Sequence, residues 1–158
     1  MDTIKVEQSS FPDARLMFIW RSDPDIAGGY HSHQDFKPLV WEDHITWLMN
    51  RHNWQFWTVY YHDRPVGIVS TGGLDTTSPD IGYYLGEKTL WKKGIMTKAI
   101  RQVLYLLFMT GVNSVHATVM DNNHASIRVM QKLGFKKVHT ARKDEGWYVL
   151  DLTPQWFQ

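Results

Sequence analysis

Residues 81–101 have the residue types and spacing of a phosphate-binding site. A strand candidate at 81–85 is followed by a lysine-rich loop and by a long helix that begins near Gly94. A helix start offers unpaired N–H groups and about half a positive charge, and a glycine lets the backbone approach a pyrophosphate. The basic residues around this point are Lys88, Lys92, Lys93, Lys98 and Arg101. The stretch indicates either a phosphate site or an ordinary helix start with solvated lysines, and it lacks the spacing of a Walker loop.

A second stretch, residues 121–135, carries a more specific pattern. It reads Asn-x-x-Ser-Ile-Arg from Asn123 and ends in Leu-Gly-Phe at Phe135. With residues 81–99 it resembles the acyl-CoA site of the GNAT superfamily of N-acyltransferases, whose patterns are [Gln/Arg]-x-x-Gly-x-[Gly/Ala] and Asn-x-x-Ser-[Ile]-[Arg]-x-x-x-x-Leu-Gly-Phe. The resemblance implies that acetyl-CoA is the co-substrate, that no metal takes part, and that an amine receives the acetyl group.

The same resemblance implies which residues bind the cofactor. The strand at 83–85 would pair with pantetheine like an added strand, the segment 92–97 would cradle the pyrophosphate, and Asn123 would hydrogen-bond the pantetheine. Ser126 would lie near the departing sulfur. The expected cofactor site is Tyr83, Tyr84, Leu85, Lys92, Lys93, Gly94, Ile95, Met96, Thr97, Asn123 and Ser126.

Three positions depart from the family pattern. Trp91 stands where glutamine or arginine is usual, and Met96 replaces the second small residue. Both bear on cofactor affinity. Met130 replaces the tyrosine that in many members protonates the leaving thiolate, so the commonest general acid is missing.

Acyl transfer to an amine needs a neutral nitrogen, a donor for the developing oxyanion and a proton for the thiolate. Because the chain has no cysteine, direct attack is favoured over a cysteinyl intermediate. His116 is the preferred base, since alternation places it on one strand face with Thr118 and an ordinary imidazole titrates near neutrality. Ser126 or a water is the candidate acid. The alternatives for the base are Asp80, Tyr83, His62 and a water chain. The alternative to a catalytic role for His116 is a histidine packed or partly solvated on the sheet.

The acceptor is harder to predict than the cofactor. Asp23, Asp25, Glu42 and Asp43 fall where the resembled family forms its acceptor cleft, so we expect an acidic wall that favours a cationic amine. Several aromatic residues could stack on a sugar or a base, although such residues more often belong to a core. These aromatic residues are Trp20, Tyr30, Trp41, Trp47, Trp54 and Trp57.

Residues 18–26 and 42–48 are similar to subgroups that act on nucleotide-linked amino sugars and on ribosomal-protein N-termini. We therefore expect a small-molecule amine acceptor and rank the amino sugar ahead of a protein α-amine, a polyamine or an antibiotic. A non-catalytic acyl-CoA-binding module is the alternative from another class. Nucleic-acid binding is not expected, because no reader motif is present.

The elements that must position these residues follow from periodicity and capping signals. The resemblance implies an α/β (α+β) fold with a mixed, mostly antiparallel sheet flanked by helices, in the order β-αα-βββ-α-β-α-ββ. Asp13 is expected to cap the first helix, which Asp23-Pro24 ends, and the second helix should bury Trp41, Ile45, Leu48 and Met49. The other expected elements are strands at 3–6, 55–61, 66–70, 81–85, 114–120, 135–140 and 147–152, and helices at 41–49, 94–110 and 123–133.

Composition sets the outer limits of this interpretation. With 158 residues, 43% hydrophobic and 21% charged, the chain is predicted to be one N-acetyltransferase domain over 1–158, either monomer or homodimer. Residues 1–80 hold 6 Lys and Arg against 11 Asp and Glu, whereas residues 81–158 hold 11 against 5. No apolar run predicts a membrane span and the first residues lack a signal peptide, so a cytoplasmic location is expected. His31-Ser32-His33 has no third partner at a metal-binding spacing.

Overall fold

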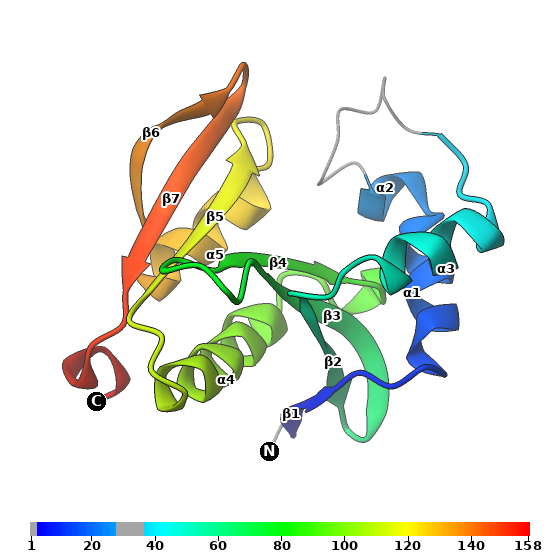
Figure 1. The fold of residues 1–158 in the computed structure, drawn as a ribbon, viewed down its shortest axis with the longest axis horizontal. Coiled ribbons are helices and arrows are strands. Elements are labelled where there is room, and N and C mark those ends of the chain that lie inside the picture. The colour runs from blue at the N-terminus through cyan, green and yellow to red at the C-terminus, as the bar shows by residue number, and fades with distance from the viewer. Residues whose placement is uncertain (1–2, 28–36) are drawn as a thin grey trace.

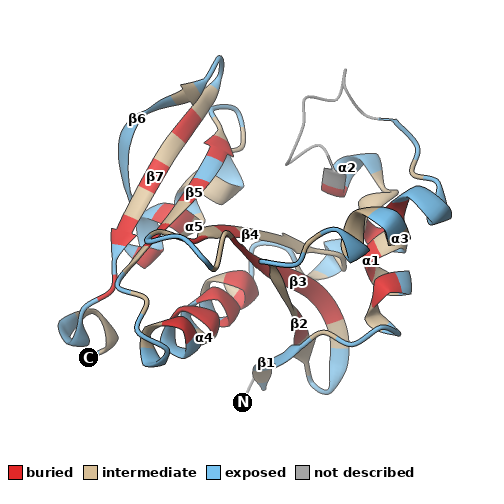
Figure 2. Cartoon of the chain, in the orientation of Figure 1, coloured by how far each residue is buried: buried red, intermediate tan, exposed pale blue. Residues whose placement is uncertain are grey.

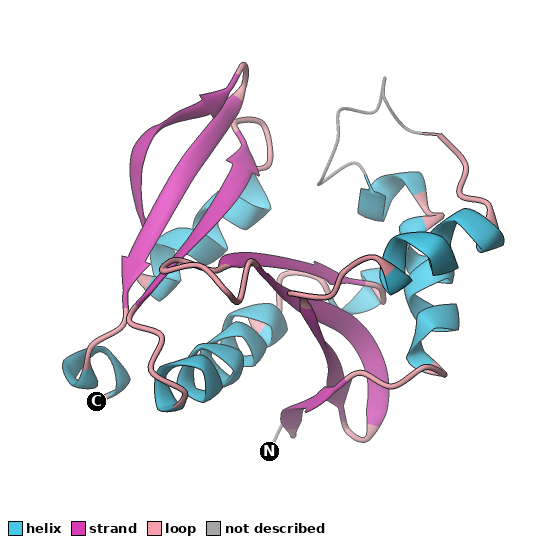
Figure 3. Ribbon diagram, in the orientation of Figure 1, coloured by secondary structure: helices cyan, strands magenta, loops and turns pink. Residues whose placement is uncertain are grey.

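The computed structural model describes residues 3–27 and 37–158, which form a curved sheet with helices on both faces (Figures 1 and 3). The strands are β1 (Ile4–Gln8), β2 (Gln55–Tyr61), β3 (Arg64–Gly72), β4 (Asp80–Leu85), β5 (Ser114–Met120), β6 (Lys136–Arg142) and β7 (Glu145–Asp151). The helices are α1 (Asp13–Arg21), α2 (Pro24–Ala27), α3 (Trp41–Met49), α4 (Ile95–Met109) and α5 (His124–Leu133), with 3-10 turns η2 (Lys88–Leu90) and η3 (Pro154–Phe157).

The seven strands lie in the order β1-β2-β3-β4-β5-β7-β6. Every neighbouring pair is antiparallel except β4 and β5, which are parallel. The predicted α/β class and mostly antiparallel sheet are thus confirmed, and the element order differs only by the extra short helix α2. None of the helices in the described ranges has the length and apolar character needed to cross a bilayer.

The parallel pair β4–β5 is the point where the sheet opens. The two strands are in register only at Asp80 and His116, after which they diverge (Figure 1). A wedge therefore forms between the rest of β4 and the rest of β5. In this wedge the backbone of β4 is not covered by a neighbouring strand.

The β2–β3 hairpin turns more tightly than predicted. We expected residues 62–65 to form the turn, but β3 already begins at Arg64. His62 and Asp63 both have positive φ, 49° and 65°, as a two-residue hairpin turn requires. Pro65 is accommodated because β4 pairs with β3 only from Gly67 onward, so no ladder bond to β4 is lost there.

The larger core lies between the sheet and the helices α4 and α5. The buried stripe of α4 is visible in Figure 2, and it consists of Ile95, Met96, Ala99, Ile100, Val103, Leu104 and Leu107. Gln102, a polar residue of α4, ties this helix to β1. Its side chain accepts from the Val6 N–H at 3.1 Å and donates to the Ile4 carbonyl at 2.7 Å.

The opposite face of the sheet is covered by α1 and α3, around Met17, Trp20, Ile26 and Ile68. Two expectations were wrong here. Asp13 does not cap α1, because Pro12 is the N-cap and the Asp13 carboxylate accepts from the Ser10 N–H instead.

The buried face of α3 was also mispredicted. Met49 is 70% exposed and Trp41 37%, whereas His44 is buried. His44 can be buried because both of its ring nitrogens have partners, the Ala14 carbonyl at 3.0 Å and the Arg21 guanidinium at 3.2 Å.

A single glycine lets α1 pack on the end of β4. A Cβ on Gly86 would lie inside the indole ring of Trp20, which is buried. We expect Gly86→Ala to lower the free energy of unfolding by about 1–3 kcal/mol, measured by denaturant titration, because the indole must move out of its packed position. In a Trp20→Leu background the same change should cost clearly less. Equal costs in the two backgrounds would mean that the indole is not the obstacle.

Candidate active site

One cavity of about 1080 Å³ runs through the β4–β5 wedge and joins the two faces of the sheet. At one end it is lined by the loop before α4 and the first turn of α5. At the other end it reaches α1, α3 and the β3 residues Ile68 and Ser70. We call these ends the cofactor end and the acceptor end, after the roles expected of them.

The cofactor end is built around the start of α4. Gly94 is the N-cap and has φ 77°, a left-handed conformation that suits glycine, and no side chain caps the helix. All six residues predicted to cradle the pyrophosphate line the cavity, namely Lys92, Lys93, Gly94, Ile95, Met96 and Thr97. Met96 is only 7% exposed and packs in the core, so it forms part of the wall and does not plug the helix start.

The predicted ring of basic residues assembles only in part. Of its five members, only Lys92 and Lys93 line the cavity. Arg101 stacks on Trp156 and donates to its carbonyl at 3.0 Å. Sequence reasoning missed Arg128 and Lys132, which line the cavity from α5; their spacing of four residues on one helix face was the available signal.

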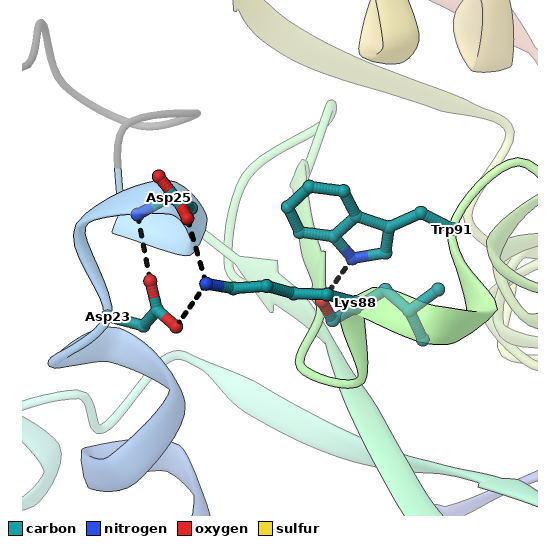
Figure 4. A network of polar contacts seen from close by, with 5 residues as sticks. Asp23, Asp25, Lys88 and Trp91 are labelled. Atoms are coloured by element: carbon teal, nitrogen blue, oxygen red, sulfur yellow. Dashed lines mark hydrogen bonds and ion pairs between the residues drawn. The ribbon is translucent and has the colours of Figure 1, made fainter.

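The backbone of β4 offers hydrogen-bonding groups to the wedge. The Gly86 N–H donates to the Val66 carbonyl at 2.7 Å, so alternation directs the backbone groups of Tyr83 and Leu85 away from β3. The Leu85 carbonyl accepts from the Trp91 indole at 2.9 Å (Figure 4). Trp91 therefore fixes the loop before α4, and the Tyr83 backbone is left facing the wedge.

The tyrosines of β4 point to opposite faces. Tyr83 donates from its hydroxyl to the Ser126 carbonyl at 3.4 Å, and burial raises the pKa of this phenol to about 12. Tyr84 points toward Trp20 on the acceptor side, with ring centroids 6.2 Å apart, and burial raises its pKa as well. Both phenols are therefore neutral at physiological pH.

The start of α5 closes the cofactor end. Asn123 is the N-cap, as predicted, and its side-chain oxygen accepts from the Ser126 N–H at 3.2 Å. Asn123 and Ser126 both line the cavity. Met130, two turns into the helix, is fully buried in the core and is not among the lining residues.

Asp80 and His116, the residue pair at which β4 and β5 are in register, bring two titratable groups together. His116 Nε2 lies 3.9 Å from Asp80 Oδ1, and His116 Nδ1 lies 2.8 Å from the Ser78 carbonyl, to which it must donate. The imidazole stacks on Trp147 at 4.0 Å. Burial raises the pKa of Asp80, Glu145 raises it further, and His116 opposes the shift. Asp80 lines the cavity, whereas His116, the preferred base from sequence, lies behind it.

The acceptor end is aromatic and cationic. The Arg21 guanidinium lies 4.1 Å from the ring centroid of Trp47, and that of Arg51 lies 4.5 Å from the same ring. Arg51 also lies 5.1 Å from the Trp54 centroid. Trp54 can lie flat on β3 because residue 72 is a glycine, whose Cβ would meet the indole. Trp47 and Trp54 thus belong to the cavity wall.

Of the four acidic residues expected to form a wall at this end, only Asp25 lines the cavity, and it is paired with a lysine. Lys88 forms ion pairs with Asp23 and Asp25, both at 2.8 Å, and hydrogen bonding from Lys88 lowers the pKa of Asp23 (Figure 4). Glu42 and Asp43 are exposed on α3 and do not line the cavity. The contact of Lys88 with Asp23 and Asp25 could not be predicted from sequence, because Lys88 lies more than 60 positions from both.

The remaining residues that the sequence singled out lie either outside the cavity or outside the described residues. His62, an alternative base, is exposed in the β2–β3 turn. Trp41 is partly exposed on α3, and Trp57 packs against the larger core. Tyr30 and the segment His31-Ser32-His33 fall outside the described residues. In the part of the chain that the structure describes, no group of three His, Cys, Asp or Glu residues could hold a metal ion.

Comparisons with known proteins agree with this arrangement. Residues 6–136 match the family described as acetyltransferase (GNAT) domain. The uncharacterized protein MJ1062 of Methanocaldococcus jannaschii is 35% identical over 153 residues, which cover 94% of this chain and 31% of that protein. The chain spans between about a third and just over half of the curated relatives that it matches.

Solved structures share the fold. A domain from Methanocaldococcus jannaschii superposes with a TM-score of 0.91 at 34% identity, covering 96% of this chain and 100% of that domain. Spermidine N-acetyltransferase from Vibrio cholerae, in complex with CoA and spermine, has a TM-score of 0.79 at 13% identity and covers 94% of this chain and 95% of its own.

Proposed function

The chain belongs to the acetyltransferase (GNAT) family, and we propose that it transfers the acetyl group of acetyl-CoA directly to a primary amine of a small molecule. One observation carries the proposal. A single cavity connects the uncapped start of α4, where a diphosphate would be stabilised, to Asp80 at the point where β4 and β5 part. A thioester held along β4 would therefore meet an amine held at the acceptor end.

We assign the proton transfers to residues at this junction. Asp80 accepts the proton that the amine loses as its nitrogen forms the new C–N bond, and His116 stabilises the ionised form of Asp80. The Tyr83 backbone N–H donates to the carbonyl oxygen as negative charge develops there. When the C–S bond breaks, the thiolate receives a proton from Ser126, which is resupplied by water, or from water itself.

We propose a nucleotide-linked amino sugar as the acceptor class. The aromatic rings of Trp47 and Trp54 offer planar surfaces for a base or a sugar, and the arginines beside them suit a phosphate. A polyamine such as spermine is a polycation. The positive charge of Arg51 would repel it, so the polyamine alternative has less support in this chain.

The proposal can be tested with purified protein, acetyl-CoA and a panel of amines. We expect release of the CoA thiol with a nucleotide-linked amino sugar, and little with spermine or an N-terminal peptide. Acetyl-CoA should also raise the melting temperature, because it binds only the folded state. A melting shift without thiol release on any amine would instead identify an acyl-CoA-binding module.

A further inference from the structure

Arg51 is a cation at the acceptor end with an unused donor. It follows α3, and its guanidinium lies over the ring of Trp47 at 4.5 Å and over that of Trp54 at 5.1 Å. Its Nε is buried and has no hydrogen-bond partner. Within residues 3–27 and 37–158, no carboxylate forms an ion pair with Arg51. A buried donor that belongs to a charged group is rarely left unpaired in a folded protein.

The position of this donor points to a ligand and not to a packing fault. The other buried side-chain donor without a partner in the described residues is Trp57 Nε1, and Trp57 does not line the cavity. Arg51 does line it. A group entering the cavity could therefore reach Arg51.

The surroundings of Arg51 are positively charged. Arg21 lies against the same Trp47 ring, and Lys37 also lines this end. Arg21 also contacts His44, whose Nε2 must donate to the Ala14 carbonyl, so its Nδ1 accepts from Arg21. Burial lowers the pKa of His44, with the charge of Arg21 acting in the same direction.

Within residues 3–27 and 37–158, the carboxylates that line the cavity are Asp25, Asp80 and Glu145, and each faces a basic residue other than Arg51. Asp25 lines the cavity but is paired with Lys88, and Asp23 is paired with the same lysine. Asp80 lies at the β4–β5 junction, where it faces His116. Arginine forms short, strong hydrogen bonds with phosphate and carboxylate oxygens.

We propose that Arg51 binds an anionic group of the acceptor, a phosphate or a carboxylate, while Trp47 and Trp54 hold it in place by stacking on its guanidinium. This inference rests on the proposed function, because it assumes that the acceptor amine enters from this end. It adds that an amine carrying an anionic group is preferred over the same amine without one.

The test is calorimetric binding of three related amino sugars in the presence of coenzyme A, which is added to cover the start of α4. The probes are glucosamine, glucosamine 1-phosphate and muramic acid. We expect at least one anionic probe to bind at least about tenfold more tightly than glucosamine, and the preferred probe distinguishes phosphate from carboxylate. Raising the salt concentration should weaken the binding of the anionic probe and leave the affinity for glucosamine unchanged.

Arg51→Gln should remove this preference, because it lowers the affinity for the anionic probe and not that for glucosamine. Arg51→Lys should keep part of it, because the charge remains but the planar donor is lost. Arg15→Gln, an exposed arginine of α1 outside the cavity, is the matched control and should bind all probes as the parent does. Melting temperature and coenzyme A affinity establish that each variant is folded.

Two results would overturn the inference: equal affinity for the anionic probes and glucosamine in the parent protein, or a preference that survives Arg51→Gln. Either can be found whether or not the protein turns over an amine. Thiol release separately decides the proposed function. A protein that acetylates glucosamine and glucosamine 1-phosphate equally well would refute the anion site while retaining the transferase.

Discussion

Replacing Asp80 with asparagine should lower kcat/KM for the amine by about 100-fold or more and leave acetyl-CoA affinity unchanged. Loss of a general base typically costs 10²–10⁴-fold, and asparagine keeps the shape of the side chain without its basicity. Initial rates of CoA thiol release and calorimetric binding of acetyl-CoA measure the two quantities. If the variant keeps most of the activity, Asp80 is not the base, and a water chain becomes the better assignment.

The pH dependence of the reaction tests the same assignment. Burial raises the pKa of Asp80, so kcat/KM should fall as the pH drops through that raised value, where the carboxylate becomes protonated. His116 opposes the rise of this pKa, so His116→Gln should shift the acid limb of the profile to higher pH. A His116 residue that only packs on Trp147 would not move that limb.

Stability separates the loss of catalysis from unfolding. The pKa of Asp80 is higher in the folded state than in the unfolded chain, so its contribution to stability is present at low pH and is lost as the pH rises through the folded value. At neutral pH the ionised carboxylate therefore costs stability. Asp80→Asn removes this cost, and we expect the inactive variant to be at least as stable as the parent at pH 7.

Placing a negative charge at the start of α4 should weaken acetyl-CoA binding by about 10- to 100-fold. Thr97 is the third residue of α4, is half-buried and lines the cavity. In Thr97→Glu the new carboxylate repels the diphosphate. The first turn of α4 contains no acidic residue, so the same carboxylate should stabilise the free protein by about 0.3–1 kcal/mol through the helix dipole.

Opposite changes in stability and affinity make this variant diagnostic. Thermal melting measures the first and calorimetry with acetyl-CoA the second. Thr97→Gln, of similar size but uncharged, should change acetyl-CoA affinity far less than Thr97→Glu. If Thr97→Glu binds acetyl-CoA as tightly as Thr97→Gln does, the diphosphate does not lie at this helix start, and the proposed orientation of the cofactor is wrong.

The ion pairs of Lys88 connect the two ends of the cavity. The turn η2 lies between β4 and α4, and Lys88 reaches from it to Asp23 and Asp25 at the α1–α2 junction (Figure 4). The loop that precedes the cofactor end is thus held to the helices of the acceptor end. Trp91 strengthens the same loop through its hydrogen bond to Leu85.

The sequence by itself determined the features that depend on neighbouring residues. The bounds of α3 and the Asn123 cap of α5 were predicted as the structure has them, and α4 begins directly after Gly94. Caps, glycine turns and hydrophobic periodicity act within one or two helical turns, so they can be read locally. That the segments 92–97 and 123–126 both contribute to one cavity lining was predictable for the same reason, since each segment is short and continuous.

The tertiary structure alone decided the charge of the acceptor end and which face of α3 is buried. Asp23 and Asp25 indicate an acidic wall in the sequence, but in the fold both are paired with Lys88. His44 is buried because Ala14 and Arg21 provide partners for its ring nitrogens. Electrostatic and hydrogen-bond partners depend on distance in space. A sequence gives the charges but not the separations between them, and at a few ångströms those separations determine whether a charge is available to a ligand or already neutralised.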